Sequence, residues 1–173
     1  MRPVSLSLVA VFVLLLGIAC SSRTNSVSLK DNVKKALEQI DLTDVTVTED
    51  REKNTITLGG RVHSENAKQQ AAEVAQAAAG NRIIANEIRV EPVGAESQSR
   101  TIASNQDADI EKAYKAALSA KGLDKERIRF KAKNGVLTLK GSVKDPRERQ
   151  EAQQIASNIP NVQQVLNEIE VNR

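Results

Sequence analysis

The sequence predicts an α+β fold of two small αββαβ units in tandem, each a three-stranded mixed sheet with two helices on one face. Three observations predict it. The phrase TLGGRV at residues 57–62 returns as TLKGSV at residues 138–143. A shift of 81 residues aligns the two copies without a gap from Thr55 to Val90. Within each copy, the hydrophobic spacing changes from helical to alternating and back. Self-similarity of this length indicates a duplicated structural unit.

The start of the chain has the pattern of a secretory signal. It reads MRPVSLSLVAVFVLLLGIAC, with Arg2 near the beginning, an apolar run from Leu8 to Leu16, and small residues after it. This pattern predicts a signal peptide over residues 1–19, because the run is too short to remain in a bilayer as a spanning helix.

Cys20, the only cysteine, stands where the apolar run ends. This arrangement resembles a bacterial lipobox, which implies cleavage before Cys20, acylation of that residue and a lipidated tether over residues 20–28. The alternative is an ordinary signal peptidase, whose small-x-small rule Gly17 and Ala19 satisfy and which would leave a soluble periplasmic protein. We expect lipidation, because a chain that avoids cysteine elsewhere places its one cysteine here.

The first unit spans residues 29–91. Apolar residues at helical spacing begin it, and Ser28 with Asp31 is the expected N-cap pair of that helix. The segments VTVTED and TITLGGRV then alternate as strands do. The expected elements are a helix over 28–40, strands over 45–50 and 55–62, a helix over 65–79 and a strand over 84–90.

The second unit spans residues 107–173 and has the same order. Asn134-Gly135 is a strong signal for a two-residue hairpin turn, and Gly122 is a suitable helix C-cap. Asp145-Pro146 with Glu148 predicts a capping box with proline in the first turn. The expected elements are a helix over 109–123, strands over 128–133 and 136–143, a helix over 147–159 and a strand over 165–171.

Gly60 and Gly141 occupy equivalent positions in the repeated phrase, where the second strand is expected to end and turn toward the following helix. A glycine at such a place permits close backbone approach or a bulge. We expect both to be structural.

These residues resemble the BON domain family, named for bacterial osmotically inducible and nodulation proteins. The matching features are TLGGRV and TLKGSV, the alanine-rich helix after each, and the endings NEIRV and IPNVQQVLNEIEV. Asn81 departs from the pattern, which has a valine there. A signal, a lipobox and two such domains look like dual-BON outer-membrane lipoproteins, which implies a lipid-anchored protein facing the periplasm.

Residues 92–106, PVGAESQSRTIASNQ, are polar and lack periodicity, so they are expected to form a linker.

The residues favour no catalytic chemistry. His63, the only histidine, follows a strand and is expected to be an exposed loop residue. Glu49, Asp50 and Glu52 are interspersed with basic residues and lack the ligand spacing of a calcium loop, so they indicate a solvated turn. We therefore expect a non-enzymatic protein with no metal or cofactor. The chain also lacks the GxxG loop of RNA-binding KH domains, so nucleic acid is not an expected partner.

Charge divides unevenly between the two units. Residues 27–91 carry a net charge of −2 and residues 107–173 a net charge of +3. Alternation along the predicted strand places four basic residues on the sheet face without helices, as candidates for anionic headgroups. These candidates are Arg127, Arg129, Lys131 and Lys133.

Two alternatives to a headgroup site remain for this strand. It could be a solvated face partly neutralised by Glu168 and Glu170, or a surface that the first unit covers. Lys112 and Lys115 on the preceding helix form a rival site, because related dual-BON lipoproteins are thought to bind anionic phospholipid through the second domain.

Two functions follow from these observations. The first is a lipid-anchored protein whose BON domains bind an anionic phospholipid surface and support envelope integrity or stress tolerance. The second is an interaction scaffold for envelope proteins or peptidoglycan, without lipid preference.

Overall fold

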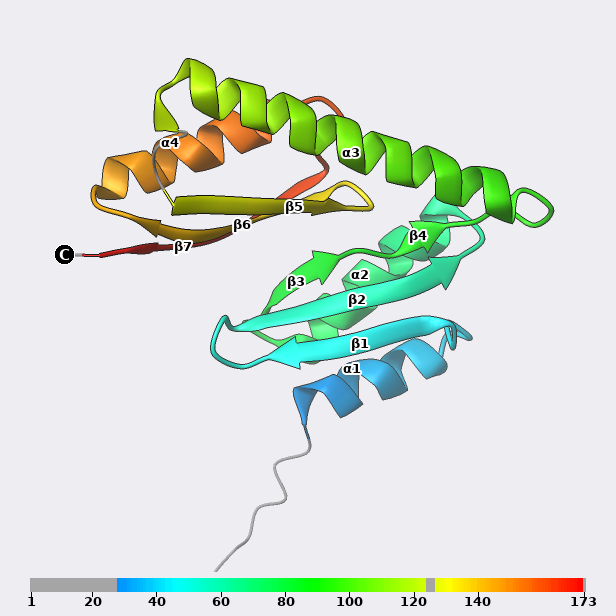
Figure 1. Ribbon diagram of the computed structural model, residues 1–173. Helices are drawn as coiled ribbons and strands as arrows, with labels where there is room; N and C mark the ends of the chain where they lie inside the picture. The colour runs from blue at the N-terminus through cyan, green and yellow to red at the C-terminus, as the bar shows by residue number, and fades with distance from the viewer. Residues whose placement is uncertain (1–27, 124–126, 173) are drawn as a thin grey trace, which may run out of the picture.

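The computed structural model describes residues 28–123 and 127–172, which form two α+β units (Figure 1). In each unit the middle strand pairs antiparallel with the strand before it and parallel with the strand or strands after the second helix, and the helices lie on one face of the sheet, so the predicted fold class is confirmed. The first unit contains α1 (Leu29–Glu38), β1 (Val45–Asp50), β2 (Thr55–Val62), α2 (Glu65–Ala79), β3 (Ile83–Asn86) and β4 (Arg89–Val90). The second contains α3 (Glu96–Ala120), β5 (Arg127–Lys133), β6 (Val136–Val143), α4 (Pro146–Ser157) and β7 (Gln164–Val171).

The last strand of each unit is tied to the second helix by the asparagine of the repeated NEI phrase. Asn86 Nδ2 donates to the Lys68 carbonyl at 3.1 Å, and Asn167 Nδ2 donates to the Arg149 carbonyl at 3.2 Å. Each Asn Oδ1 also accepts the N–H of the isoleucine two residues later. In the first unit the strand is interrupted here, so the expected strand over 84–90 is divided into β3 and β4, which both pair with β2.

Both cores contain the residues that the 81-residue shift aligns. Leu37, Leu58, Ala71 and Ala75 are buried in the first unit, and Leu118, Leu139, Ala152 and Ala156 in the second. The alanines carry little bulk, so α2 and α4 can lie close to their sheets.

Tyr114 supplies bulk to the second core, where the first unit has Val33. Its ring meets Phe130 edge-on at a centroid distance of 5.0 Å, and its hydroxyl donates to the Ala152 carbonyl at 3.1 Å. Burial raises the pKa of the Tyr114 hydroxyl, because the phenolate would lose its solvation. Tyr114 is therefore a packing residue.

The local sequence signals hold with one exception. Asp145 and Glu148 form the capping box of α4, and Asn134 and Gly135 both have left-handed φ angles, of 48° and 82°. Ser28 is the residue before α1, but its hydroxyl bonds the Glu49 carboxylate at 3.1 Å and does not cap the helix. Glu49 thereby competes successfully for the hydroxyl that the helix N-terminus could have used.

The segment expected as a linker is largely helical, which corrects that prediction. Helix α3 starts at Glu96 and continues into the second unit, where Ile110 and Tyr114 enter the core. Figure 1 shows its N-terminal half extending over the β4 end of the first unit. Residues 96–106 lack hydrophobic periodicity because they do not cover a core of their own.

A buried carboxylate fastens this half of α3 to the first unit. Glu91 follows β4 and is fully buried. Its Oε1 accepts hydrogen bonds from Arg100 Nε of α3, at 3.0 Å, and from Arg89 Nε of β4. The bond from Arg100 is the largest influence that holds the pKa of Glu91 below its usual range, and the bond from Arg89 adds to it against the opposing effect of burial.

The two units also meet along the open edge of β3. The N–H of Asn86 donates to Gln164 Oε1 at 3.2 Å, and Gln164 Nε2 donates to the Ile84 carbonyl at 2.7 Å. A residue of a neighbouring parallel strand would form the same two bonds around Ala85. The Gln164 side chain thus covers an edge that would otherwise be open to another strand.

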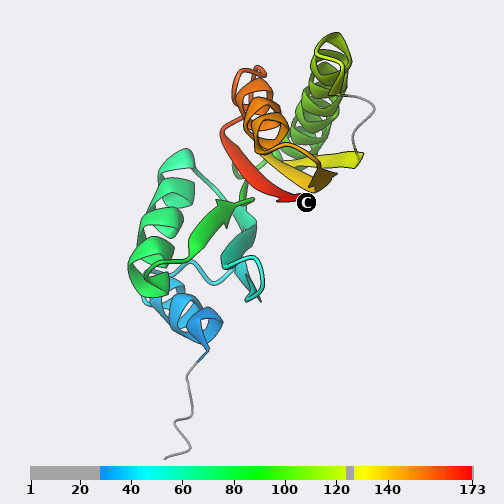
Figure 2. The same ribbon diagram turned by 90° about the vertical axis from the view of Figure 1, so that its left-hand side faces the viewer.

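Close packing of side chains accompanies these polar contacts. Ala85, Val136 and Leu166 are buried although they belong to neither core. Asn134 at the hairpin tip donates from Nδ2 to the Glu87 carbonyl at 2.7 Å. The view in Figure 2 shows the second unit beside the β3 side of the first. The junction therefore combines buried apolar side chains with hydrogen bonds between the two units.

Gly60 and Gly141 lie at paired strand positions, two residues before their strands end. Gly60 pairs with Val45 and has a φ of +88°, and Gly141 pairs with Ile128 and has a φ of +118°. A Cβ on Gly60 would lie 2.2 Å from the Asp44 carbonyl oxygen, and one on Gly141 would lie 1.8 Å from the Arg127 carbonyl oxygen. Each position thus combines a left-handed backbone with contact against the neighbouring strand.

Gly141→Ala should therefore lower the free energy of unfolding by more than about 2 kcal/mol, because the strand pair must move apart as well as adopt a strained φ. Gly122→Ala is the matched control, since Gly122 has a φ of +73° and no atom within 4 Å of its Cβ site. It should cost only the backbone strain, about 1–2 kcal/mol. Urea unfolding measures both, and equal losses would show that the contact with Arg127 carries no cost.

Glu91→Gln should lower stability at pH 7 and make it less sensitive to acid. The native pKa of Glu91 is depressed, so the stability that its ionised form contributes is present above the unfolded value of about 4.3 and is lost as pH falls through the native value. The difference between wild type and variant, measured by urea unfolding, should thus shrink below pH 4.3. Glu73→Gln, on the exposed side of α2, is the control. Equal stability of the Glu91 and Glu73 variants at pH 7 would contradict the role of Glu91.

Candidate functional site

The candidate basic residues of β5 alternate with core-facing residues. Arg127, Arg129, Lys131 and Lys133 are exposed, whereas Ile128, Phe130 and Ala132 between them are partly or fully buried. Figure 1 shows α3 and α4 together on one side of the second sheet, and the first unit toward the other. The four basic side chains thus share the sheet face that carries no helix.

Lys131 is engaged with a carboxylate of α3. Its Nζ lies 2.9 Å from Glu111 Oε1, and the same oxygen accepts the N–H of Ala132 at 3.0 Å. Burial of Glu111 opposes ionisation, but these two bonds outweigh it and leave the pKa of Glu111 below its usual range. Glu111 thereby protects the edge of β5 and takes up part of the charge of Lys131.

Lys133 is engaged with the first unit. Its Nζ lies 2.6 Å from Oε2 of Glu87, the residue after β3. The first unit therefore covers the basic face of β5 at this end of the strand, as one of the two alternatives from the sequence predicted. Part of the charge difference between the units therefore serves to hold them together.

Glu168 and Glu170 form their ion pairs with cations outside β5. Glu168 pairs with Lys140 at 3.4 Å, and Glu170 pairs with Lys53 of the first unit at 3.2 Å. Strand β6 separates β7 from β5, so the two carboxylates meet nearer cations first. Within residues 28–123 and 127–172, Arg127 and Arg129 form no ion pair.

The rival pair, Lys112 and Lys115, lies on the opposite side of the second sheet. Both are exposed on α3, one helical turn apart. Neither forms an ion pair with any residue that the structure describes. Lys131 reaches α3 through its ion pair with Glu111, one helical turn from Lys115, so the two sets of cations approach each other at the edge of β5.

The histidine and two acidic residues of the first hairpin, which were considered as candidate chemical groups from the sequence, form hydrogen bonds within the first unit. His63 is exposed after β2, and its Nδ1 lies 2.9 Å from the Glu91 carbonyl oxygen. Glu49 bonds Arg82 Nη2 at 3.1 Å, and the Asp50 carboxylate accepts the N–H of Lys53. Cys20 lies outside the described residues.

Sequence reasoning missed the residues of the junction. Lys68, Gln163 and Gln164 are ordinary polar residues in sequence, and only their hydrogen bonds between the units distinguish them. Asn134 was identified as a turn residue, but its second role, as a contact to Glu87, carries no sequence signal.

Among the helices of the described residues, none has the length and apolar character needed to span a bilayer.

The chain matches one protein family, and it is weakly similar to two solved structures. The BON domain profile matches residues 25–92 and 106–173. Two solved structures of CdsD, a structural protein of the type III secretion system of Chlamydia trachomatis, are distantly similar. The C-terminal domain of CdsD has 14% identity and a TM-score of 0.35, with 86% of this chain and 100% of that chain covered.

The other CdsD structure has 11% identity and a TM-score of 0.37, with 82% of this chain and 90% of that chain covered. No curated protein sequence matches the chain. The family profile covers most of both units, including both copies of the repeated phrase, so the chain belongs to the BON domain family.

Proposed function

We propose that this protein binds anionic phospholipid through its second BON domain, without catalysis, and that an acylated Cys20 holds it at the periplasmic side of the outer membrane. BON domains suggest envelope-related membrane or protein-binding roles. The observation that carries the lipid proposal is the concentration of exposed basic side chains in the second unit, with Lys112, Lys115, Arg127 and Arg129 free of ion pairs among the described residues.

The geometry favours α3 over β5 as the contacting element. Lys131 and Lys133 each have a carboxylate within 3 Å, and a paired cation gains less from a membrane surface. Arg129 lines a hollow whose other charged residues, two basic and three acidic, leave it without a net positive charge. The other charged residues are Lys53, Lys140, Asp50, Glu168 and Glu170. Lys112 and Lys115 have neither restriction. Each basic residue near an anionic surface contributes about 1 kcal/mol.

A second function, an envelope-protein scaffold, is favoured by a different observation. Val93 is 80% exposed and Ile102 is 57% exposed, and both lie near the start of α3. Exposed apolar side chains of this size can take part in a protein contact. In this alternative, the protein supports envelope integrity by binding a partner protein, and only its acyl anchor contacts lipid.

Reversal of the charge of α3 tests the lipid proposal. In a chain of residues 27–173, the double variant Lys112→Glu and Lys115→Glu should bind vesicles of phosphatidylglycerol and phosphatidylcholine at least 30-fold more weakly than wild type. This is the effect of losing about 2 kcal/mol from two contacts. Wild-type binding should also weaken as salt rises above physiological strength, where the Debye length is about 8 Å.

Two matched variants complete that experiment. Arg127→Glu with Arg129→Glu tests β5, and Lys34→Glu with Lys35→Glu makes the same charge change on α1, the equivalent helix of the first unit. The α1 variant should bind like wild type. If all three variants lose affinity equally, the effect is net charge only, and if wild type does not prefer anionic vesicles, the scaffold becomes the better function.

Cys20→Ser should release the protein from membranes and abolish acyl labelling in cells. Several acyl chains bury enough CH₂ groups, at about 0.8 kcal/mol each, to anchor a protein stably. Membrane fractionation and metabolic labelling with a fatty acid measure the two effects. Wild-type protein recovered in the soluble fraction with a free thiol would instead indicate cleavage by an ordinary signal peptidase.

A further inference from the structure

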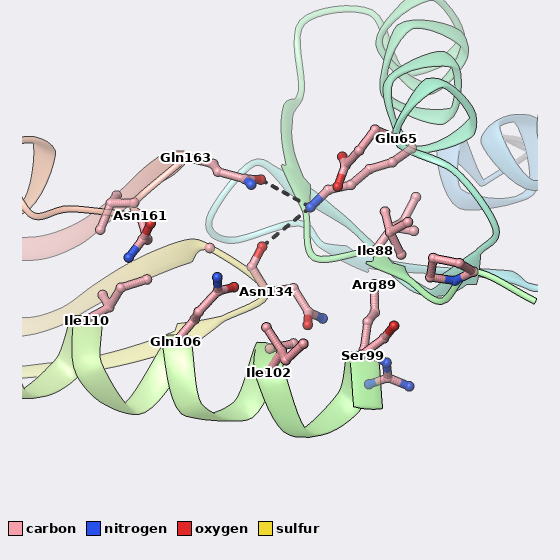
Figure 3. A pocket seen from close by; sticks show the side chains of 16 residues that line it. Glu65, Ile88, Arg89, Ser99, Ile102, Gln106, Ile110, Asn134, Asn161 and Gln163 are labelled. Atoms are coloured by element: carbon pink, nitrogen blue, oxygen red, sulfur yellow. Dashed lines mark hydrogen bonds between the residues drawn. The ribbon is translucent and has the colours of Figure 1, made fainter. Parts of the chain in front are cut away.

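The junction between the two units contains a pocket of about 380 Å³ (Figure 3). Its wall combines α2 and β4 of the first unit, the N-terminal half of α3, and loops of the second unit. Pockets of this size at domain boundaries are common sites for small molecules. Neither unit alone would form it.

Lys68 contributes a buried amine to this pocket. Only 8% of the residue is exposed, and its Nζ donates to Gln163 Oε1 at 3.1 Å and, at the long distance of 3.5 Å, to the Asn134 carbonyl oxygen. Both acceptors are uncharged, and no carboxylate of the described residues lies within 4 Å of the amine. Burial accordingly lowers the pKa of Lys68, although the more distant charges of Glu65 and Asp107 oppose the effect.

This arrangement leaves the ammonium form of Lys68 short of partners. An ammonium group has three N–H donors, and one of the two bonds here is marginal in length. A buried cation without a counter-ion is costly, and an anion brought to it recovers that cost. An anionic ligand in the pocket would supply the close counter-ion that Lys68 does not have among the described residues.

Apolar side chains form the remainder of the wall. Ile88 and Ile110 line the pocket but are buried in the cores of the two units. The accessible apolar surface comes from Val162, which is partly buried, and from Ile102, which is 57% exposed. The side chains of Gln106 and Asn161 stand around the same hollow (Figure 3) and can supply further hydrogen bonds. The lining thus offers one cationic point, a few amides and a hydrophobic surface.

We propose that this pocket binds a small monocarboxylate with an apolar body, with its carboxylate on Lys68 and its body against Ile102 and Val162. A monoanion is favoured over a phosphate dianion because Glu65 lines the pocket and Asp107 lies nearby, so a second negative charge would be repelled. Arg89 also lines the pocket but is bonded to Glu91, which offsets its charge.

The position of the pocket gives the ligand a structural effect. A molecule that contacts both units binds only while they are docked, so it stabilises the docked arrangement by RT ln(1 + L/Kd), where L is its free concentration and Kd its dissociation constant. This binding site is separate from the α3 lysines proposed for lipid, and a variant of one site leaves the other intact.

Hexanoate is a suitable probe, with acetate, hexan-1-ol and inorganic phosphate as comparisons. In a chain of residues 27–173, hexanoate should bind with a dissociation constant of about 1 mM, a modest affinity appropriate to so few atoms. In ¹H–¹⁵N spectra, the amide shifts should centre on Asn134, Gln163 and Lys68. Hexan-1-ol, which lacks the charge, and phosphate, which lacks the apolar body, should each bind at least tenfold more weakly.

Variants separate the two halves of the site. Lys68→Met should weaken hexanoate binding at least tenfold, whereas Lys35→Met, on the exposed side of α1, should have no effect. Ile102→Ser changes an exposed residue and should weaken hexanoate but not acetate, which keeps the test valid if the Lys68 variant fails to fold. Shifts located away from the junction, or equal binding of hexan-1-ol and hexanoate by wild type, would overturn the proposal.

Discussion

The structure depends on helix α3 belonging to both units at once. Its C-terminal half supplies Ile110, Tyr114 and Leu118 to the second core, and its N-terminal half is held to the first unit by the bond of Arg100 to the buried Glu91 carboxylate. A helix is stiff over this length, so fixing both halves fixes the second unit relative to the first. The Gln164 edge contact, the interfacial pocket and the pairing of Lys133 with Glu87 all require that placement.

Electrostatics follow from the same constraint. The second unit has a positive net charge and the first a negative one, and two ion pairs, Lys133 with Glu87 and Lys53 with Glu170, connect them. Exposed ion pairs contribute little stability, so their main effect is on register and approach. For the proposed membrane contact, the available charge is on the side of the second unit away from the first, where α3 carries Lys112 and Lys115.

The internal repeat made the fold of each unit predictable from the sequence. The contacts between the units could not be predicted in this way, because each involves a residue from only one copy of the repeat. The 81-residue shift and the NEI phrase placed the helices, strands and shared core positions such as Leu58 and Leu139. Residues 96–106 were expected to be a linker because they carry no apolar stripe, and their main tie to the first unit is the polar bond of Arg100 to Glu91. The candidate cations of β5 were placed on the correct face, but their partners, Glu111 and Glu87, come from other elements and cannot be read from alternation.

Lys68 shows how the copies have diverged under this arrangement. Its equivalent in the second unit is Arg149, which is exposed and donates to the carbonyls of Ile169, at 2.9 Å, and Asn167, at 3.3 Å, within its own unit. In both copies, the backbone at this position accepts the asparagine of the NEI phrase, so the local fold is the same. Only the first copy is covered by a neighbour. The shorter amine of Lys68 lies beneath the second unit with neutral acceptors, and a free pocket adjoins it. The backbone hydrogen bond at this position is thus the same in both units. The surroundings of the side chain differ, because the other unit covers Lys68 but not Arg149.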